Sequence, residues 1–253
     1  MLPKPNKLSG NTYLAKKLIA PLALDVQKIH ACPNHCILYR KEYEHYDRCP
    51  VCKRSRYKRN DDREDEDDST EVEDTSSNAR KKRKIPAMVM WYLSVIARLK
   101  RLFSNPRDSE LMSWHFEQAQ KKTDEMLRHP SDASQWRNID TIHPRFGDEP
   151  RNVRFALSTD GMNPFGDMSS SHSTWPVVLS ILNIPSWLCM KRKYLMLSIL
   201  IQGPKQPGND IGVFLEPLLE DMVKLWNNGE LVWDEFKQEC FTLRTMIFVA
   251  ITD

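Results

Sequence analysis

Residues 153–183 constrain the fold of this chain more than any other stretch, because they predict a strand, a sharp turn and a second strand in direct succession. Apolar residues alternate with polar or small ones over residues 153–158, which is the period of a half-buried strand. Asp160 follows, and the Gly, Asn and Pro residues after it form a dense turn signal. A second strand is predicted over residues 175–181. A carboxylate therefore stands where a core strand ends and a loop begins, a position at which side chains are held in place and reach solvent.

Asp160 has a simpler interpretation as well, since Asp-Gly is a common turn dipeptide without any further role. Two other acids compete with it. Asp167 lies in the same loop, beyond Gly166, and Asp210 precedes a predicted helix, where an aspartate most simply serves as the N-cap.

The residues after this loop continue the same pattern. An apolar run at 194–201 predicts a third strand, and residues 210–228 place apolar side chains every three or four positions, as on one face of a helix. Pro217 either kinks that helix or marks its true first turn. Residues 241–252 predict a buried strand, which Asp253 follows.

The predicted order is therefore strand, strand, strand, helix, strand. In a ribonuclease-H-like layout the first and fourth strands are neighbours, so Asp160 and Asp253 would meet at one edge of the sheet. Two close carboxylates repel each other unless a divalent cation lies between them. Hard oxygen ligands suit Mg²⁺ or Mn²⁺ rather than zinc. The chemistry indicated is in-line attack of water or a 3′-hydroxyl on a phosphodiester.

Length and composition limit the alternatives. A chain of 253 residues holds one or two modest domains, and its 40% hydrophobic and 28% charged residues indicate globular parts mixed with solvated ones. Neither a membrane span nor a secretory signal is predicted. Six cysteines, four of them clustered, favour metal binding in a reducing compartment over a disulfide framework.

The clustered cysteines form two pairs, Cys32 with Cys36 and Cys49 with Cys52, with twelve residues between the pairs. Four thiolates on two tight turns match tetrahedral zinc, and four protein ligands leave no open position for catalysis. The predicted role is therefore to stabilise a segment too small for a core of its own. The alternatives are reduced thiols without a metal, or a nearby histidine in place of one cysteine.

Basic side chains alternate with tyrosines around these cysteines. This mixture is typical of a nucleic-acid surface, where the charges contact phosphates and the rings stack on bases, although a protein-binding knuckle explains it equally well. The candidate nucleic-acid contacts are Arg40, Lys41, Lys53, Arg54, Arg56 and Lys58.

The changes in composition divide the chain into five segments. They are a disordered N-terminus (1–13), a zinc-knuckle segment (14–59) that opens with a short helix, a charged disordered linker (60–84), a helical segment (85–150) and a partial ribonuclease-H-like domain (151–253). Helices are predicted over 88–103 and 109–128, followed by an irregular stretch at 130–151. The basic residues 81–84 fit a nuclear import signal, a phosphate contact, or neutralisation of the acidic run before them. His115, Cys189 and Cys240 are interpreted as buried or core-edge residues, and 191–193 as either a phosphate-facing cluster or a solvated turn.

Two long stretches, ALSTDGMNPFGDMSSSHSTWPVVL and PSWLCMKRKYLMLSILIQGPKQPGNDIGVFLEPLLEDMVKLW, closely resemble the catalytic region of plant CACTA-type (En/Spm) transposases. The upstream IHACPNHCILYRKEY is similar to the zinc-knuckle segment of the same proteins. The resemblance runs from about residue 14 to residue 253, with Met162 in place of the usual Phe.

This resemblance implies that Asp160 and Asp253 are the first two members of an acidic triad that holds Mg²⁺ or Mn²⁺, with the third acid beyond this chain. It implies a nuclear protein that cleaves and joins DNA at transposon ends, as an oligomer or with a partner transposon protein. The chain is expected to be a fragment that is inactive alone. The alternatives are a transposon-derived, non-catalytic zinc-dependent protein that binds DNA or protein, and an unstable product without a role.

Overall fold

The computed structural model describes residues 26–58, 84–124, 126–163, 173–204 and 206–251. These residues form a mixed α and β structure. The strands are β1 (Val26–His30), β2 (Val89–Leu93), β3 (Val153–Thr159), β4 (Trp175–Ile181), β5 (Leu195–Ile201), β6 (Glu230–Asp234), β7 (Glu239–Leu243) and β8 (Thr245–Ile251). The helices are α2 (Val95–Phe103), α3 (Pro106–Leu111), α4 (Trp114–Lys121), α5 (Ser134–Ile142), α6 (Pro144–Gly147), α7 (Ser186–Cys189) and α8 (Ile211–Asn227), with 3₁₀ turns at Lys41–Tyr43, Pro130–Asp132 and Gly208–Asp210.

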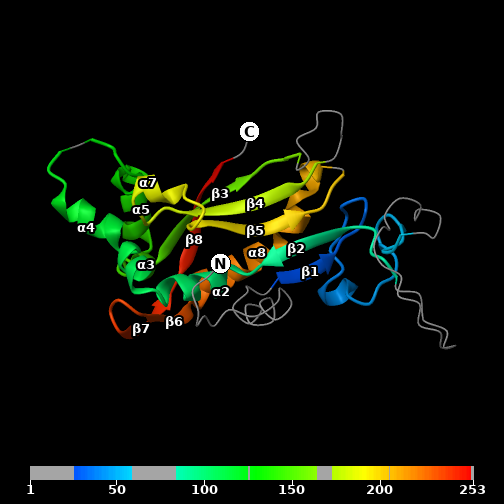
Figure 1. Cartoon of the computed structure of the whole chain (residues 1–253), viewed down its shortest axis with the longest axis horizontal. Helices are drawn as coiled ribbons and strands as arrows, with labels where there is room; N and C mark the ends of the chain where they lie inside the picture. Colours follow the sequence, from blue (N-terminus) through cyan, green and yellow to red (C-terminus); the bar gives the residue numbers. More distant parts are fainter. Residues whose placement is uncertain (1–25, 59–83, 125, 164–172, 205, 252–253) are drawn as a thin grey trace, which may run out of the picture.

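Six strands form one sheet in the order β1-β2-β5-β4-β3-β8, and β6 pairs with β7 in a separate hairpin. All neighbours in the large sheet are antiparallel except β3 and β8, which are parallel. The three predicted strands β3, β4 and β5 are adjacent, and β8 lies beside β3 (Figure 1). The parallel pair is possible because α8 and the β6–β7 hairpin carry the chain from β5 back to the far edge.

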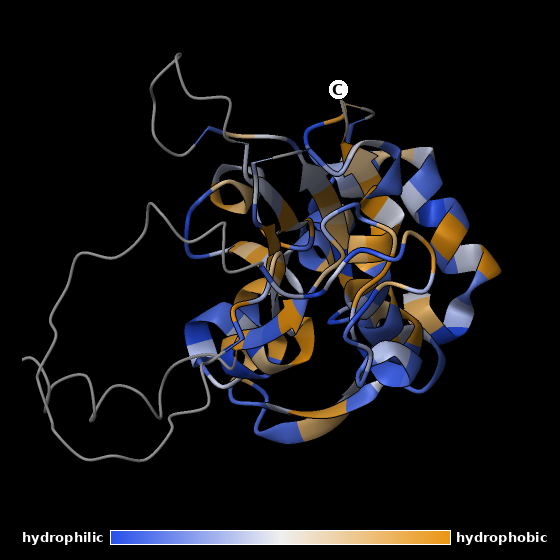
Figure 2. Ribbon diagram, turned by 90° about the vertical axis from the view of Figure 1, so that its right-hand side faces the viewer, coloured by the Kyte–Doolittle hydropathy of each residue, from blue (hydrophilic) through white to orange (hydrophobic). Residues whose placement is uncertain are grey.

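Helices α2 and α8 pack on one face of the sheet and supply much of the main core, which contains Leu99, Phe103, Phe214 and Leu218 from these helices. In Figure 2 the ribbons of the strands carry mostly hydrophobic colours, whereas hydrophobic and hydrophilic colours alternate along the outer helix. On the other face, Trp136 of α5 packs in a second cluster with residues of β3 and β8. The sheet is therefore covered on both sides near β3.

Strand β3 is buried on both faces rather than half-buried as predicted. Phe155 points into the main core, whereas Arg154 and Ala156 face α5 and are only 3% and 5% exposed. The guanidinium of Arg154 lies 4.0 Å from the centroid of the Trp136 ring and pairs with Asp140. An alternating pattern predicts a half-buried strand only when its polar face is exposed to solvent. In β3 that face is covered by α5.

The predicted helix over 88–103 is wrong in its first half, because residues 89–93 form β2 and helix α2 starts at Val95. The spacing of the apolar residues fits both structures, and pairing with β1 and β5 on either side decides for a strand. The predicted helix over 109–128 is also interrupted: α3 ends at Leu111, and α4 covers only Trp114–Lys121. The stretch predicted to be irregular contains α5 and α6.

The single strand predicted over 241–252 is divided between β7 and β8 at Arg244. Here the backbone N–H of Arg244 donates to Oδ1 of Asn152 at 2.7 Å, and its carbonyl accepts from Val153 N at 2.9 Å. These contacts turn the chain away from the hairpin and start its pairing with β3. Cys240 is exposed on β7, contrary to the prediction, while Cys189 is buried as expected.

Helix α8 is confirmed, and Pro217 lies inside it rather than in its first turn. Asp210 occupies the N-cap position, but its side chain makes no capping hydrogen bond. Gly229 follows the helix with φ of 75°, and a Cβ at this position would lie 2.4 Å from Cγ2 of Thr242, so the turn into β6 requires glycine.

The predicted N-terminal disorder, the short helix after residue 13 and most of the charged linker lie outside the described residues. Within the described residues, no helix has the length and apolar character needed to cross a membrane.

Candidate functional site

The four clustered cysteines stand on two tight turns. His35 N donates to the carbonyl of Cys32 at 2.8 Å, and Lys53 N donates to the carbonyl of Cys49 at 2.9 Å. His35 and Lys53 have φ of 62° and 61°, the left-handed conformation that closes each turn.

These turns bring all four Sγ atoms within 4.8 Å of one another, and Sγ of Cys32 lies 3.4 Å from Sγ of Cys52. A tetrahedral zinc ion with bonds of about 2.3 Å needs sulfur atoms roughly 3.8 Å apart, so the donor set fits zinc. Burial raises the pKa of Cys32 to about 12 and that of Cys36 to about 11. Burial also opposes ionisation of Cys52, but hydrogen bonds from Arg54 N and the other thiols outweigh it and lower its pKa to about 7.

Two of the nearby histidines make other contacts. His30 Nδ1 accepts from Nε of Arg56 at 2.9 Å, and the His35 ring packs edge-to-face on Phe214, with 5.6 Å between the centroids. The group that could hold a metal therefore consists, within the described residues, of cysteines alone.

The knuckle segment, residues 26–58, is joined to the large sheet rather than standing as a separate module. Strand β1 pairs with β2 along its whole length, and Ala31 N continues the contact by donating to the carbonyl of Met88 at 3.0 Å. Arg40 makes two hydrogen bonds to the Glu220 carboxylate of α8, at 3.0 and 2.6 Å. Lys41 pairs with the same carboxylate at 2.6 Å.

The candidate nucleic-acid residues consequently fall into two groups. Arg40 and Lys41 are ion-paired to α8, and Arg56 is half-buried, with its guanidinium 4.8 Å from the centroid of the Tyr39 ring. The exposed group consists of Lys53, Arg54 and Lys58, and Nζ of Lys53 donates to the carbonyl of Pro50. Sequence reasoning missed the acidic partner on α8, because Glu220 is separated from Arg40 by 180 residues.

Asp160 is exposed and follows directly after β3, as predicted. Its Oδ1 accepts from the backbone N–H of Gly161 at 2.6 Å. A Cβ on Gly161 would lie 2.9 Å from the Trp175 ring, so the chain passes close to β4 at this point. Met162 and Thr174 then pair across the base of the loop.

Strand β8, the parallel neighbour of β3, ends at the same end of the sheet as β3. Ser158 of β3 stands opposite Ile251 of β8, the last pair in their register. Asp160 lies two residues after Ser158, and Asp253 lies two residues after Ile251 in the sequence. Asp253 itself is outside the described residues, as is the rival acid Asp167.

Two other sites singled out in the sequence, His115 and the basic cluster at 191–193, make contacts elsewhere in the fold. His115 is buried beside Trp136, and burial, the largest cause, lowers its pKa to about 3. In the basic cluster at 191–193, Nζ of Lys193 pairs with the buried Asp108 at 2.5 Å, while the two residues before it are exposed.

Comparison with known proteins supplies the family. No curated protein matches the chain. The family model described as Transposase family tnp2 matches residues 124–253, slightly more than half of the chain, including β3, Asp160, α8 and β8. The chain therefore belongs to the transposase family tnp2.

Proposed function

We propose that this protein is a DNA transposase of the CACTA type, and that residues 151–253 form part of a ribonuclease-H-like domain for metal-dependent strand cleavage and joining. The observation that carries the proposal is the parallel pair Ser158–Ile251, because it sets the ends of β3 and β8 side by side. Asp160 and Asp253 each follow this pair by two residues. The strand order β5-β4-β3-β8 supports the same layout, since the first predicted strand neighbours the fourth.

In this proposal the two carboxylates hold Mg²⁺ or Mn²⁺ at the edge of the sheet. Oxygen ligands suit these hard cations, and a bound ion would offset the charge that develops on the attacked phosphate and on the leaving oxygen. The chain contributes a fixed position for Asp160, because β3 is buried on both faces and Gly161 packs against Trp175. The proposed partner is DNA at transposon ends and the proposed location is the nucleus, and membership of a transposase family supports action on DNA.

The zinc centre has a structural part in this proposal. Its four sulfur ligands would occupy every position of a tetrahedral ion, and the knuckle segment is paired with β2 and α8. Zinc would therefore stabilise the part of the sheet next to β5.

The test is metal-dependent nicking of supercoiled DNA by the purified protein, with Asp160→Asn compared to Asp210→Asn. Asp210 is the exposed rival acid at the N-cap position of α8, so the comparison tells whether Asp160 rather than its rival acts in nicking. Loss of an outer contact to a metal costs 10- to 100-fold, so loss of a direct ligand should lower the nicking rate by at least about tenfold. Asp210→Asn should leave the rate unchanged. Equal rates for the two variants would refute the role of Asp160.

A second candidate function is non-catalytic, zinc-dependent binding of DNA or protein. The exposed basic group Lys53, Arg54 and Lys58 beside the zinc turns favours it. This candidate replaces the first if the wild-type protein binds DNA with a salt slope of several phosphate contacts but does not nick it in Mg²⁺ or Mn²⁺.

A further inference from the structure

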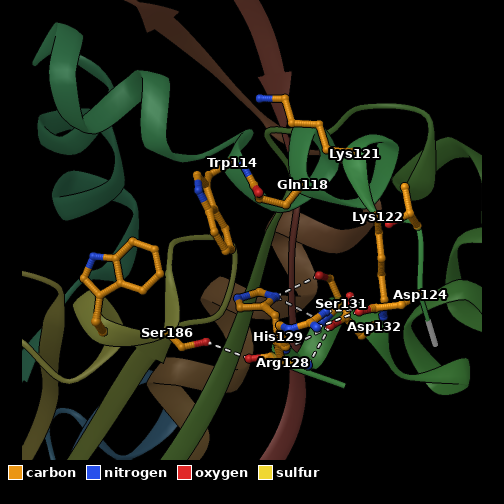
Figure 3. A pocket seen from close by; sticks show the side chains of 12 residues that line it. Trp114, Gln118, Lys121, Lys122, Asp124, Arg128, His129, Ser131, Asp132 and Ser186 are labelled. Atoms are coloured by element: carbon orange, nitrogen blue, oxygen red, sulfur yellow. Dashed lines mark hydrogen bonds and ion pairs between the residues drawn. The ribbon is translucent and has the colours of Figure 1, made fainter. Parts of the chain in front are cut away.

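A cavity of about 410 Å³ lies between α4, residues 122–124 and 128–132, and α7 (Figure 3). It lies at the end of the sheet opposite to Asp160. Helix α7 follows the Ile181 end of β4, and Ile181 pairs with Phe155 near the start of β3, whereas Asp160 follows the last residue of β3. The seven residues of β3 span roughly 20 Å at 3.3 Å per residue. The cavity is therefore a site separate from the proposed metal centre.

Two tryptophans form the aromatic wall of this cavity. Trp114 and Trp187 meet edge-to-face, with 5.7 Å between ring centroids and an angle of 82°. Trp187 is 68% exposed, although a tryptophan usually buries most of its large apolar surface. An aromatic ring left open beside a cavity offers a face on which another planar ring can stack.

The buried His129 holds the ring of Trp114 in place. Its ring meets the His129 ring at 5.2 Å, and His129 is buried, with Nδ1 bonded to Oγ of Ser131 at 2.8 Å and Nε2 to the carbonyl of Ile184 at 3.1 Å. The hydroxyl of Ser186 also donates to the carbonyl of Arg128 at 3.3 Å, which joins α7 to the opposite wall. The aromatic wall is thus preorganised.

Among the described residues that line the cavity, the cations outnumber the carboxylates. Arg128 makes two hydrogen bonds of 2.7 Å to Asp124, and Lys122 pairs with Asp132 at 3.2 Å. Lys121 lies at the rim above Gln118 in Figure 3, and among the described residues no ion pair is found for it. Among the described lining residues, three cations therefore face two carboxylates, which favours an anionic ligand over a cationic one.

We propose that this cavity binds one unpaired nucleotide of a DNA strand, with the base stacked on Trp187 beside Trp114 and a phosphate at Lys121. The volume lies within the 300–1,000 Å³ of typical small-ligand sites. Proteins bind single-stranded nucleic acid without sequence preference by stacking its bases on aromatic side chains and placing basic side chains beside its phosphates. This inference rests on the proposed action on DNA and adds that the protein grips an unpaired strand away from the metal centre.

The experiment measures the affinity of the full chain for a fluorescently labelled oligo-dT and for a duplex of equal length. Trp187→Ala is compared with Trp233→Ala, a control at a tryptophan that is 43% exposed on β6. Loss of one base stack should weaken oligo-dT binding at least about fivefold, with a smaller effect on the duplex. Trp187→Phe should restore part of the affinity, and the exposure of Trp187 predicts an unchanged melting temperature.

The phosphate contact has its own readout. Lys121→Ala should reduce the slope of log affinity against log salt for oligo-dT by about 0.7, the value for one phosphate of a single strand, whereas Trp187→Ala should leave the slope unchanged. Lys237→Ala, at an exposed lysine after β6, is the control. The proposal is overturned if Trp187→Ala behaves like Trp233→Ala, or if oligo-dT and duplex lose affinity equally. Nicking assays on the same variants separate this result from a failure of the metal-centre proposal.

Discussion

Replacing Glu220 with Gln tests whether the knuckle segment is held to α8 by the ion pair with Arg40. The two carboxylate–guanidinium hydrogen bonds are 3.0 and 2.6 Å long, and the side chains are 23% exposed for Arg40 and 37% for Glu220. This geometry is better than that of a typical surface pair, but both groups retain solvent. The substitution keeps a hydrogen-bonding group of similar shape and removes the negative charge.

Exposed ion pairs contribute about 0.2–1 kcal/mol, and buried hydrogen bonds to charged groups about 1.5–3 kcal/mol. Partial exposure of Arg40 and Glu220 places their pair between these limits, at about 1 kcal/mol. In a chain of this size such a loss lowers the melting temperature by about 2–4 °C. Hydrogen exchange should show the effect first in β1 and in residues 41–43, which the pair connects to α8.

A double-mutant cycle of Arg40→Gln with Glu220→Gln isolates the pair from other effects of each substitution. Lys84 and Asp47 provide the control cycle, since their atoms are 3.3 Å apart but both side chains are 64% exposed, so their coupling should be close to zero. A coupling below about 0.3 kcal/mol for Arg40 and Glu220 lies within the usual error of additivity and would refute the reasoning.

Two further predictions concern the zinc cysteines and a buried histidine. Cys49→Ser should abolish stoichiometric zinc, measured by atomic absorption, and reduce hydrogen-exchange protection of β1 while β3 stays protected; the exposed Cys240→Ser is the control. His115 has a pKa lowered to about 3 by burial, against about 6.5 when unfolded, so the unfolded chain alone takes up its proton and stability falls as pH drops below 6.5. The free energy of unfolding should fall by up to about 1.4 kcal/mol per pH unit, as measured by urea unfolding at pH 6.5, 5.5 and 4.5. This fall should be smaller in His115→Gln but not in His143→Gln, a substitution at an exposed histidine. Equal pH dependence in all three proteins would contradict this assignment.

The sequence by itself determined the elements that local pattern specifies. The run of apolar residues in β4 and β5, the three- and four-residue spacing of α8 and the two cysteine turns each need only neighbours within one element or one turn. For the same reason the position of Asp160 at the end of β3 was predictable, because an alternating stretch followed by a glycine turn marks where a strand stops.

Tertiary structure alone decided the partners of these elements. Residues 89–93 satisfy a helical spacing, yet they form β2 because β1 and β5 supply backbone partners on both sides. Arg40 and Lys41 are residue types typical of a DNA-binding surface, but in the fold both pair with the Glu220 carboxylate of α8. Backbone hydrogen bonds and ion pairs join residues 59 to 180 positions apart here, and the periodicity of a single segment says nothing about partners so far away in the sequence. The four cysteines that could hold zinc are therefore recognisable in the sequence, whereas the attachment of their segment to the sheet is visible only in the fold.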